Sequence, residues 1–183
     1  MKIFYAIDPD EKIKRQIKYY AEKLSKYLKA GRMIDPFNYH ITLEYVGNID
    51  DVRSVAYIEV LKRAAADIEQ SEIVLKGVSS FVKKKRELIY LNVDGNEEIS
   101  KLKKNISIDL GSKEKSFLPH ITLYRDAVFK DGFSIESISD IIEHKEIRFI
   151  AKDAVLMEST LINGKIVYMI LYDQKFKGAN NGS

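Results

Sequence analysis

The stretch His40-Ile41-Thr42-Leu43 returns eighty residues later as His120-Ile121-Thr122-Leu123, in a chain that contains only three histidines. β-Branched and apolar residues dominate each copy, which is typical of a strand. Because alternate side chains of a strand point to opposite faces, Ile and Leu share one face and His and Thr share the other. We therefore predict that the apolar face enters a core, and that the two His/Thr faces together line a symmetric pocket.

The composition is that of an ordinary globular protein. The 183 residues are 45% hydrophobic and 31% charged, and the net charge of +3 permits a polyanionic partner without requiring one. Cysteine is absent, which excludes disulfides, thiolate nucleophiles and thiolate metal sites. No apolar run approaches the length of a membrane span, and the chain starts with a strand-like pattern rather than a signal peptide. We expect a cytoplasmic protein.

Hydrophobic periodicity and turn residues divide the chain into alternating elements. Strands are predicted at 2–8, 40–46, 72–82, 87–93, 117–125, 146–159 and 165–173. Helices are predicted at 9–29, 52–69, 97–110 and 134–143. Gly31 is expected to stop the first helix, 126–133 to form a turn-rich connection, and 177–183 to form a frayed tail.

The order helix, glycine, short loop and His-Ile-Thr-Leu occurs twice, which suggests an internal duplication. The predicted fold class is α+β, with a mainly antiparallel sheet and helices in each of two lobes. We expect one bilobal domain over residues 1–183, related by a pseudo-two-fold axis, with the motif strands lining the cleft between the lobes.

A histidine pair can move two protons in one step, because imidazole titrates near pH 6.5 and can serve as acid or base. Displacement at phosphorus suits such a pair: one histidine deprotonates water or a hydroxyl, and the other protonates the leaving alcohol. The threonine hydroxyls would hold non-bridging phosphate oxygens. The scheme needs no metal or cofactor, and the residues alone do not say which histidine is the acid. A single His-x-Thr sequence more often has a structural role, but its repetition favours a catalytic role. His144 lies among charged residues in the sequence and is expected at the surface.

The extended motifs Tyr39-His40-Ile41-Thr42-Leu43-Glu44-Tyr45-Val46-Gly47 and Pro119-His120-Ile121-Thr122-Leu123-Tyr124-Arg125 resemble the two signatures of the two-histidine phosphoesterase superfamily. More narrowly, they are similar to those of the RNA 2′,3′-cyclic phosphodiesterases, also called 2′-5′ RNA ligases. The opening stretch 3–8 and the closing residues 156–168 are similar too, so the resemblance covers nearly the whole chain. It implies a bilobal fold, no metal, and hydrolysis of RNA 2′,3′-cyclic phosphate ends to 2′-phosphomonoesters. ATP-independent 2′-5′ ligation would be the reverse reaction.

Carried over to matching positions, the resemblance implies that His40 donates a proton to the leaving 3′ oxygen and that His120 accepts one from water. Thr42 and Thr122 would bind the phosphate. Arg125 matches a position associated with the substrate phosphate, and an Arg fork suits that task.

Strict alternation from His120 disagrees about Arg125, because it places Tyr124 on the catalytic face and Arg125 on the opposite one. Arg125 reaches the pocket only if the strand ends or bulges after Leu123. Glu44 shares the His40 face by the same parity, where it could raise a histidine pKa or lie exposed to solvent.

The basic run Lys83-Lys84-Lys85-Arg86 is predicted to form a hairpin turn. It is either a solvated turn or a surface that contacts RNA backbone phosphates. Phe37, Phe81 or Tyr124 could stack a terminal base, but core packing explains most aromatic residues equally well.

Two other functions fit the same residues. One is a two-histidine phosphoesterase that acts on a small cyclic nucleotide, or as an exonuclease at an RNA 3′ end. The other is an RNA- or nucleotide-binding module without turnover, although both motifs are intact. The expected partner is RNA with 2′,3′-cyclic phosphate or 2′-phosphate ends, with no obligate protein partner and a monomeric state.

Overall fold

The computed structural model describes residues 1–50, 54–112, 116–139 and 146–178. Within these ranges the helices are α1 (Glu11–Ser25), α2 (Ser54–Ala65), α3 (Glu97–Asp109) and α4 (Ile135–Ser139), with a 3-10 helix at Pro36–Asn38. The strands are β1 (Lys2–Ile7), β2 (Leu28–Met33), β3 (Ile41–Asn48), β4 (Ser71–Lys83), β5 (Arg86–Val93), β6 (His120–Phe129), β7 (Ile147–Ala151), β8 (Asp153–Ile162) and β9 (Lys165–Lys175). None of the described helices is long and apolar enough to cross a membrane.

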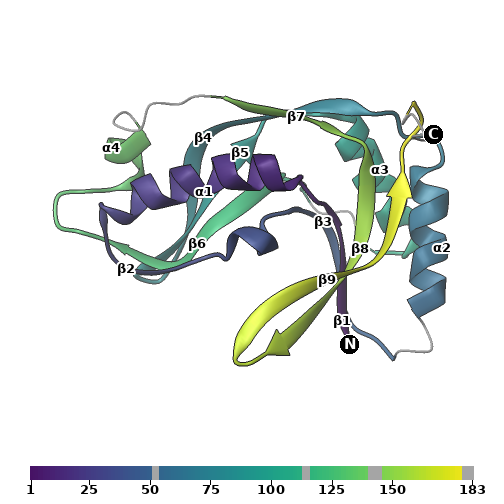
Figure 1. Ribbon diagram of the computed structural model, residues 1–183, viewed down its shortest axis with the longest axis horizontal. Helices are drawn as coiled ribbons and strands as arrows, with labels where there is room; N and C mark the ends of the chain where they lie inside the picture. The colour runs from purple at the N-terminus through teal and green to yellow at the C-terminus, as the bar shows by residue number, and fades with distance from the viewer. Residues whose placement is uncertain (51–53, 113–115, 140–145, 179–183) are drawn as a thin grey trace.

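The described strands form one antiparallel sheet in the order β7-β4-β5-β6-β3-β1-β8-β9, with β2 beside β6 (Figure 1). Its two halves meet at the motif strands β3 and β6, whose register has the single pair Ile41–Ile121. Away from this pair, β3 pairs with β1, whereas β6 pairs with β5 and β2. The predicted α+β fold with two antiparallel halves is confirmed, and the two halves are joined in one continuous sheet.

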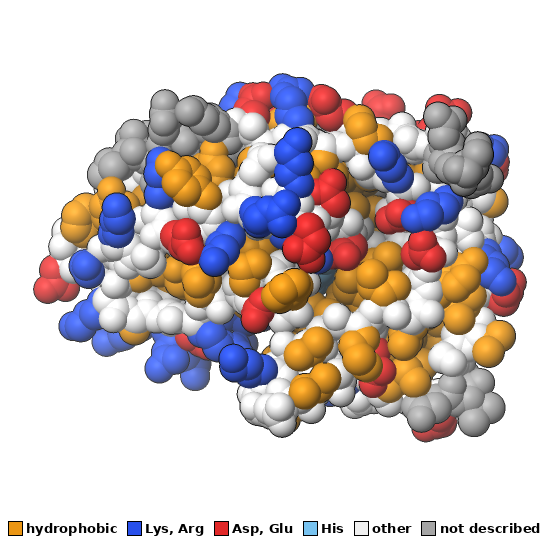
Figure 2. All heavy atoms as spheres, in the orientation of Figure 1, with side chains coloured by type: hydrophobic (Ala, Val, Ile, Leu, Met, Phe, Trp, Pro, Cys, Tyr) orange, Lys and Arg blue, Asp and Glu red, His pale blue; other side chains and the backbone are white. Residues whose placement is uncertain are grey.

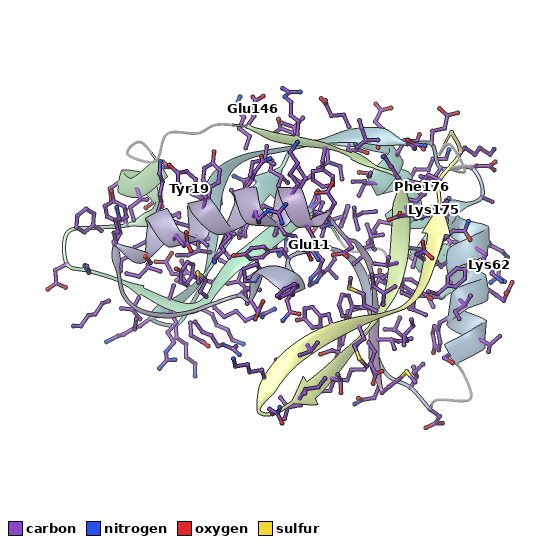
Figure 3. The ribbon with its side chains drawn as sticks, in the orientation of Figure 1. Glu11, Tyr19, Lys62, Glu146, Lys175 and Phe176 are labelled. Carbon is purple, nitrogen blue, oxygen red and sulfur yellow. The ribbon has the colours of Figure 1, made fainter. Side chains whose placement is uncertain are left out.

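Helices cover both halves. α1 contacts β2, β6 and β7, whereas α2 and α3 pack together beside β3, β8 and β9 (Figure 1). Asp10 begins α1 by accepting a hydrogen bond from the Ile13 amide at 2.9 Å. Ile17 and Leu24 are buried on one side of α1, whereas Tyr19 points outward and is exposed (Figure 3).

The apolar faces of the two motif strands lie in the core, as predicted. Ile41, Leu43, Ile121 and Leu123 are all buried. They belong to one hydrophobic cluster that extends from Ile3 to Phe176 and draws on both halves of the sheet. We propose that the halves fold as one domain, because they share this cluster and a continuous sheet.

The prediction for residues 26–33 was wrong. The helix ends at Ser25, and the strand β2 follows and pairs with β6. Gly31 lies inside β2 with a φ of +151°, where an added Cβ would come within 3.2 Å of the Ala127 Cα. This close approach of two backbones, rather than a helix stop, accounts for the glycine.

Two further boundaries differ from the predictions. β6 continues through 126–129, which were expected to be a turn, because β2 supplies a neighbouring strand there. The expected strand 146–159 is two strands separated at Lys152: β7 pairs with β4, and β8 pairs with β1. Predictions for 52–53, 140–145 (including His144) and 179–183 lie outside the described residues. At the start of the expected frayed tail, Lys177 pairs with Glu69.

Candidate active site

A pocket of about 100 Å³ lies between the motif strands β3 and β6. The histidine and threonine of both tetrapeptides line it, so the structure brings together the four side chains that the repeat singled out. The complete lining is Ile34, Asn38, His40, Thr42, Leu88, His120, Thr122, Arg125 and Tyr168. Within the described residues, no group of three or more His, Asp or Glu side chains is arranged to hold a metal ion.

Both histidine rings are oriented in the same way. His40 Nδ1 lies 2.7 Å from the Asn38 carbonyl oxygen, and His120 Nδ1 lies 2.8 Å from the Leu118 carbonyl oxygen. A carbonyl oxygen can only accept, so each Nδ1 carries a hydrogen and each neutral ring has its lone pair on Nε2. The Thr42 hydroxyl then donates to His40 Nε2 across 2.9 Å.

Each imidazole is flanked by a phenylalanine and a tyrosine. Phe4 and Tyr168 lie 4.9 and 5.0 Å from the His40 ring centroid. Phe81 and Tyr90 lie 5.5 and 4.9 Å from that of His120. Of these four rings, sequence reasoning named only Phe81 as a candidate for the site. The pairing of β1, β5 and β9 with their neighbours places the other three, and no local sequence pattern reports it.

The environment of His40 keeps this ring neutral in the free protein. Burial is the main cause that lowers the pKa of His40 to about 4, and the positive charges of Lys14 and Arg125 act in the same direction. The hydrogen bond to the Asn38 carbonyl oxygen opposes these effects. At neutral pH, His40 Nε2 is therefore a proton acceptor until something negative enters the pocket.

A β-bulge brings Arg125 to the pocket. Tyr90 of β5 faces Thr122, but the adjacent Ile89 faces Tyr124, so Leu123 is an extra residue on β6. The alternation reverses there, and Arg125 lines the pocket. The sequence had left two outcomes open for this arginine, and the bulge decides between them.

The same bulge sends the Tyr124 ring into the core. Its hydroxyl donates to the Ala21 carbonyl oxygen at 2.9 Å, and the residue is buried. The expectation from strict alternation that Tyr124 faces the catalytic side was wrong, and Tyr124 offers no ring face to a base.

Glu44 turns away from the pocket toward α3. Its carboxylate accepts hydrogen bonds from Lys103 Nζ and Ser107 Oγ, each at 2.9 Å. The register of β1 with β3 shifts between Tyr5 and Ala6, which breaks the parity that Glu44 was expected to share with His40. Glu44 therefore stabilises the packing of α3 rather than the charge of a histidine.

The basic hairpin borders a second, larger groove. Lys84 and Lys85 form the turn between β4 and β5. The groove has a volume of about 870 Å³, and Arg125 also lines it, so it adjoins the smaller pocket. Figure 2 shows Lys and Arg side chains gathered at the lower left of the molecule, where β2 lies in Figure 1. The groove is lined by Arg32, Phe81, Lys83, Lys84, Lys85, Arg86, Glu87, Leu88, Arg125 and Asp126.

Two imidazoles line one pocket, each with a threonine two residues further on, and they share an arginine. This is the arrangement expected from the resemblance to the two-histidine phosphoesterases. Residues 7–91 match the family model described as LigT like Phosphoesterase. An RNA 2′,3′-cyclic phosphodiesterase of Thermotoga maritima is 27% identical over 97% of both chains. One of Methanocaldococcus jannaschii is 26% identical over 93% of this chain and 98% of its own.

Crystal structures of E. coli LigT with NADP+ and with 3′-AMP have the same fold. Each has a TM-score of 0.77 and 20% sequence identity, and covers 96% of this chain and 97% of LigT. Together these findings confirm the resemblance carried by the motifs. The chain is similar to the LigT-like phosphoesterases over nearly its whole length.

Proposed function

We propose that this protein hydrolyses 2′,3′-cyclic phosphate ends of RNA to 2′-phosphomonoesters by two-histidine acid–base catalysis. One observation carries the proposal: the Nε2 atoms of two identically oriented imidazoles serve one pocket, which both motif threonines and Arg125 also line. The names of the relatives in Thermotoga maritima and Methanocaldococcus jannaschii support the same substrate.

In the proposed reaction, His120 Nε2 accepts a proton from water while the water oxygen forms a bond to phosphorus. The bond from phosphorus to the 3′ oxygen breaks, and protonated His40 Nε2 gives its proton to that oxygen. Thr42, Thr122 and Arg125 hold the non-bridging oxygens, where negative charge develops. Each proton transfer contributes roughly 100-fold to 10,000-fold to the rate.

The donor role requires His40 to gain a proton before turnover, because its pKa of about 4 leaves it neutral in the free protein. An anionic phosphate beside the ring favours the imidazolium and raises this pKa. Once Nε2 is protonated it no longer accepts from Thr42, so the Thr42 hydroxyl becomes free to donate to the phosphate. Substrate binding and protonation of His40 therefore support each other.

The pair and the hydroxyls supply the chemistry without a metal or cofactor. With a 5′ hydroxyl in place of water, the same steps would form a 2′-5′ linkage without ATP: the 5′ oxygen bonds to phosphorus, the bond to the 3′ oxygen breaks, and the two histidines move the same protons. Water at bulk concentration favours hydrolysis. We also propose that Lys83, Lys84, Lys85 and Arg86 contact RNA backbone phosphates, because they line the groove that adjoins the pocket. That groove favours an RNA end over a small cyclic nucleotide. The cytoplasmic location stays a prediction.

The experiment is to incubate the protein, with EDTA present, with a short RNA that ends in a 2′,3′-cyclic phosphate, and to identify the product. We expect a 2′-phosphate end, and we expect neither His40→Ala nor His120→Ala to form it. Binding without conversion by the unmutated protein would indicate a binding module instead. Loss of activity with EDTA would refute the metal-free scheme.

A further inference from the structure

Lys14 is a buried lysine that the proposed mechanism does not use. Only 8% of the residue is exposed. Its Nζ lies 2.7 Å from Asp8 Oδ1 and donates to the Phe37 carbonyl oxygen at 3.1 Å. Taking an ammonium group out of water costs free energy even when a carboxylate accompanies it. A lysine in this position is therefore better explained by a role at a nearby site than by stability alone.

The partners of Lys14 join three separate segments. Asp8 directly follows β1, Lys14 lies on α1, and Phe37 belongs to the 3-10 helix at Pro36–Asn38. This 3-10 helix has no buried residue, and Phe37 itself is 71% exposed. Because core packing does not hold the 3-10 helix, its position depends on hydrogen bonds.

The 3-10 helix leads directly to His40. The next carbonyl oxygen after that of Phe37 belongs to Asn38, and it accepts from His40 Nδ1 at 2.7 Å. The main chain of Phe37 is held on two sides, because its amide donates to Asp35 Oδ1 at 3.1 Å and its carbonyl oxygen accepts from Lys14. The position of the carbonyl that orients the imidazole thus depends on Lys14.

The charge of Lys14 also acts on this imidazole. Burial is the main cause that lowers the pKa of His40, and Lys14 acts in the same direction as Arg125 and His120 of β6. Asp8 is the carboxylate beside Lys14. Burial raises the pKa of Asp8, and the hydrogen bond and charge of Lys14 oppose that rise.

The remaining charged or titratable groups of the neighbouring elements have other surroundings. Glu44 of β3 turns toward α3. Asp35, Lys18 and Lys165 line the adjoining pocket of about 520 Å³, and Tyr168 of β9 packs on the His40 ring. Of all these charged groups, only Lys14 is both buried and bonded to the segment that anchors the imidazole.

We propose that Lys14 is a positioning residue for His40, the proton donor of the proposed reaction. By fixing the main chain at Phe37, it holds the Asn38 carbonyl where this group orients the imidazole with Nε2 toward the pocket. Lys14 itself does not touch the reacting atoms, and its role rests on the proposed function. Its charge also disfavours the imidazolium in the free protein, and the charge of Asp8 limits that effect.

The first test is Lys14→Met, which keeps a long side chain and removes its charge and hydrogen bonds. Loss of the anchor should lower kcat roughly 10- to 100-fold with little change in KM, because the substrate contacts remain. Loss of the charge should increase the protonated fraction of His40 at about pH 4.5, close to its pKa of about 4. NMR measures this fraction, and His40→Gln identifies the resonance. An unchanged kcat or an unchanged fraction overturns the positioning role.

Asp8→Asn should move the protonated fraction of His40 in the opposite direction. This variant keeps the shape of the side chain and the bond from Lys14 to Phe37, but it removes the negative charge beside the ammonium group. The fraction at the same pH should therefore fall. Loosened packing would admit water and raise it in both variants, so a rise or no change in Asp8→Asn overturns the role. Because Asn is isosteric with Asp, this variant also carries the test if Lys14→Met fails to fold.

Lys103→Met is the matched control. Lys103 is also 8% exposed, and it pairs with Glu44 at 2.9 Å. The side-chain exposures of this pair are 10% and 17%, against 10% and 18% for Lys14 and Asp8. Urea unfolding should show a similar loss of stability in the two Met variants, whereas kcat and the His40 titration should change only in Lys14→Met. Equal changes in Lys103→Met would show a general effect of losing a buried ion pair and would overturn the role.

The positioning role and the proposed function can fail separately, because the NMR titration needs no turnover. If the unmutated protein does not hydrolyse the cyclic phosphate but His40 titrates as expected in the variants, the proposed function alone is refuted. If hydrolysis proceeds and Lys14→Met leaves the His40 titration unmoved, the positioning role alone is refuted.

Discussion

At the scale of single residues, Asn38 joins His40 to the β8–β9 hairpin. Its carbonyl oxygen accepts from His40 Nδ1, its Nδ2 donates to the Ile166 carbonyl oxygen at 2.8 Å, and its Oδ1 accepts from the Tyr168 amide at 3.2 Å. The side chain thus holds in place the segment whose tyrosine packs on the His40 ring. We therefore propose that Asn38 positions the His40 ring through Tyr168.

Asn38→Ala keeps the carbonyl and removes only this side-chain link. We expect kcat to fall several-fold more than KM rises, and the pKa of His40 to rise because a loosened Tyr168 admits water to the ring. Steady-state kinetics and an NMR titration of His40 measure both. Asn105→Ala is the control, since Asn105 on α3 makes a similar bond to the carbonyl oxygen of Ala64 on α2. An unchanged His40 titration in Asn38→Ala would contradict the positioning role.

The lowered pKa of His40 also predicts how stability depends on pH. An unfolded histidine gains its proton near pH 6.5, whereas His40 stays neutral in the fold until about pH 4. Its contribution is therefore fully present above pH 6.5 and is lost as the pH falls from 6.5 toward 4. Urea unfolding at pH 7.5 and 5.0 should show that the unmutated protein loses on the order of 1–2 kcal/mol more than His40→Gln over this interval. Parallel losses in the two proteins would show that His40 titrates normally.

At the scale of elements, pairing with β2 fixes the path of β6 beyond the motif residues. β2 pairs with β6 from Tyr124 to Phe129 and presents Arg32 opposite Arg125. This pairing includes the close approach at Gly31, where a φ of +151° strains any other residue and an added Cβ would press on the Ala127 Cα at 3.2 Å.

Gly31→Ala should reduce the free energy of unfolding by roughly 1–3 kcal/mol, because of backbone strain and the clash with Ala127. Gly95→Ala, where nothing lies within 4 Å of an added Cβ, should change it by less than about 0.5 kcal/mol. Urea denaturation measures both variants. Equal stability of the two variants would contradict this account of β2.

Sequence could predict what is local in these elements and not what depends on distant partners. The apolar and polar faces of the two motif strands, α3 and the basic hairpin follow from periodicity and turn residues. β2 contains Lys29, Gly31 and Arg32 and has little apolar pattern, so only its pairing with β6 makes it a strand. The bulge at Leu123 and the rings beside each histidine likewise arise from the register between strands far apart in the chain.

At the scale of the whole molecule, the two halves differ in charge and exposure around a nearly symmetric centre. Beside His40, Phe4 is buried and Tyr168 lines a pocket of about 520 Å³, whereas Phe81 beside His120 opens onto the larger groove of about 870 Å³ that the basic hairpin borders. RNA that extends into the larger groove should bind with an affinity that depends on salt, because the hairpin lysines line that groove.

The variant Lys84→Ala/Lys85→Ala should raise KM for an RNA octamer that ends in a 2′,3′-cyclic phosphate, and should lessen the dependence of log KM on log salt by up to about 1.4. The KM for a cyclic mononucleotide should stay unchanged. The control Lys2→Ala/Lys12→Ala makes the same change in net charge, but neither lysine lines the groove. Rates measured between 50 and 200 mM salt, on the order of physiological ionic strength, report the slope. Equal slopes for the two variants would show that only overall charge matters.

The two halves of the sheet meet between β3 and β6 at the single register pair Ile41–Ile121. Each motif histidine is one residue from this pair, whereas the β4–β5 and β8–β9 turns lie at the far ends of long hairpins (Figure 1). Both isoleucines lie in the core that the two halves share. The separation of the proposed acid and base is therefore set by the packing of this core, at some distance from the turns that meet solvent.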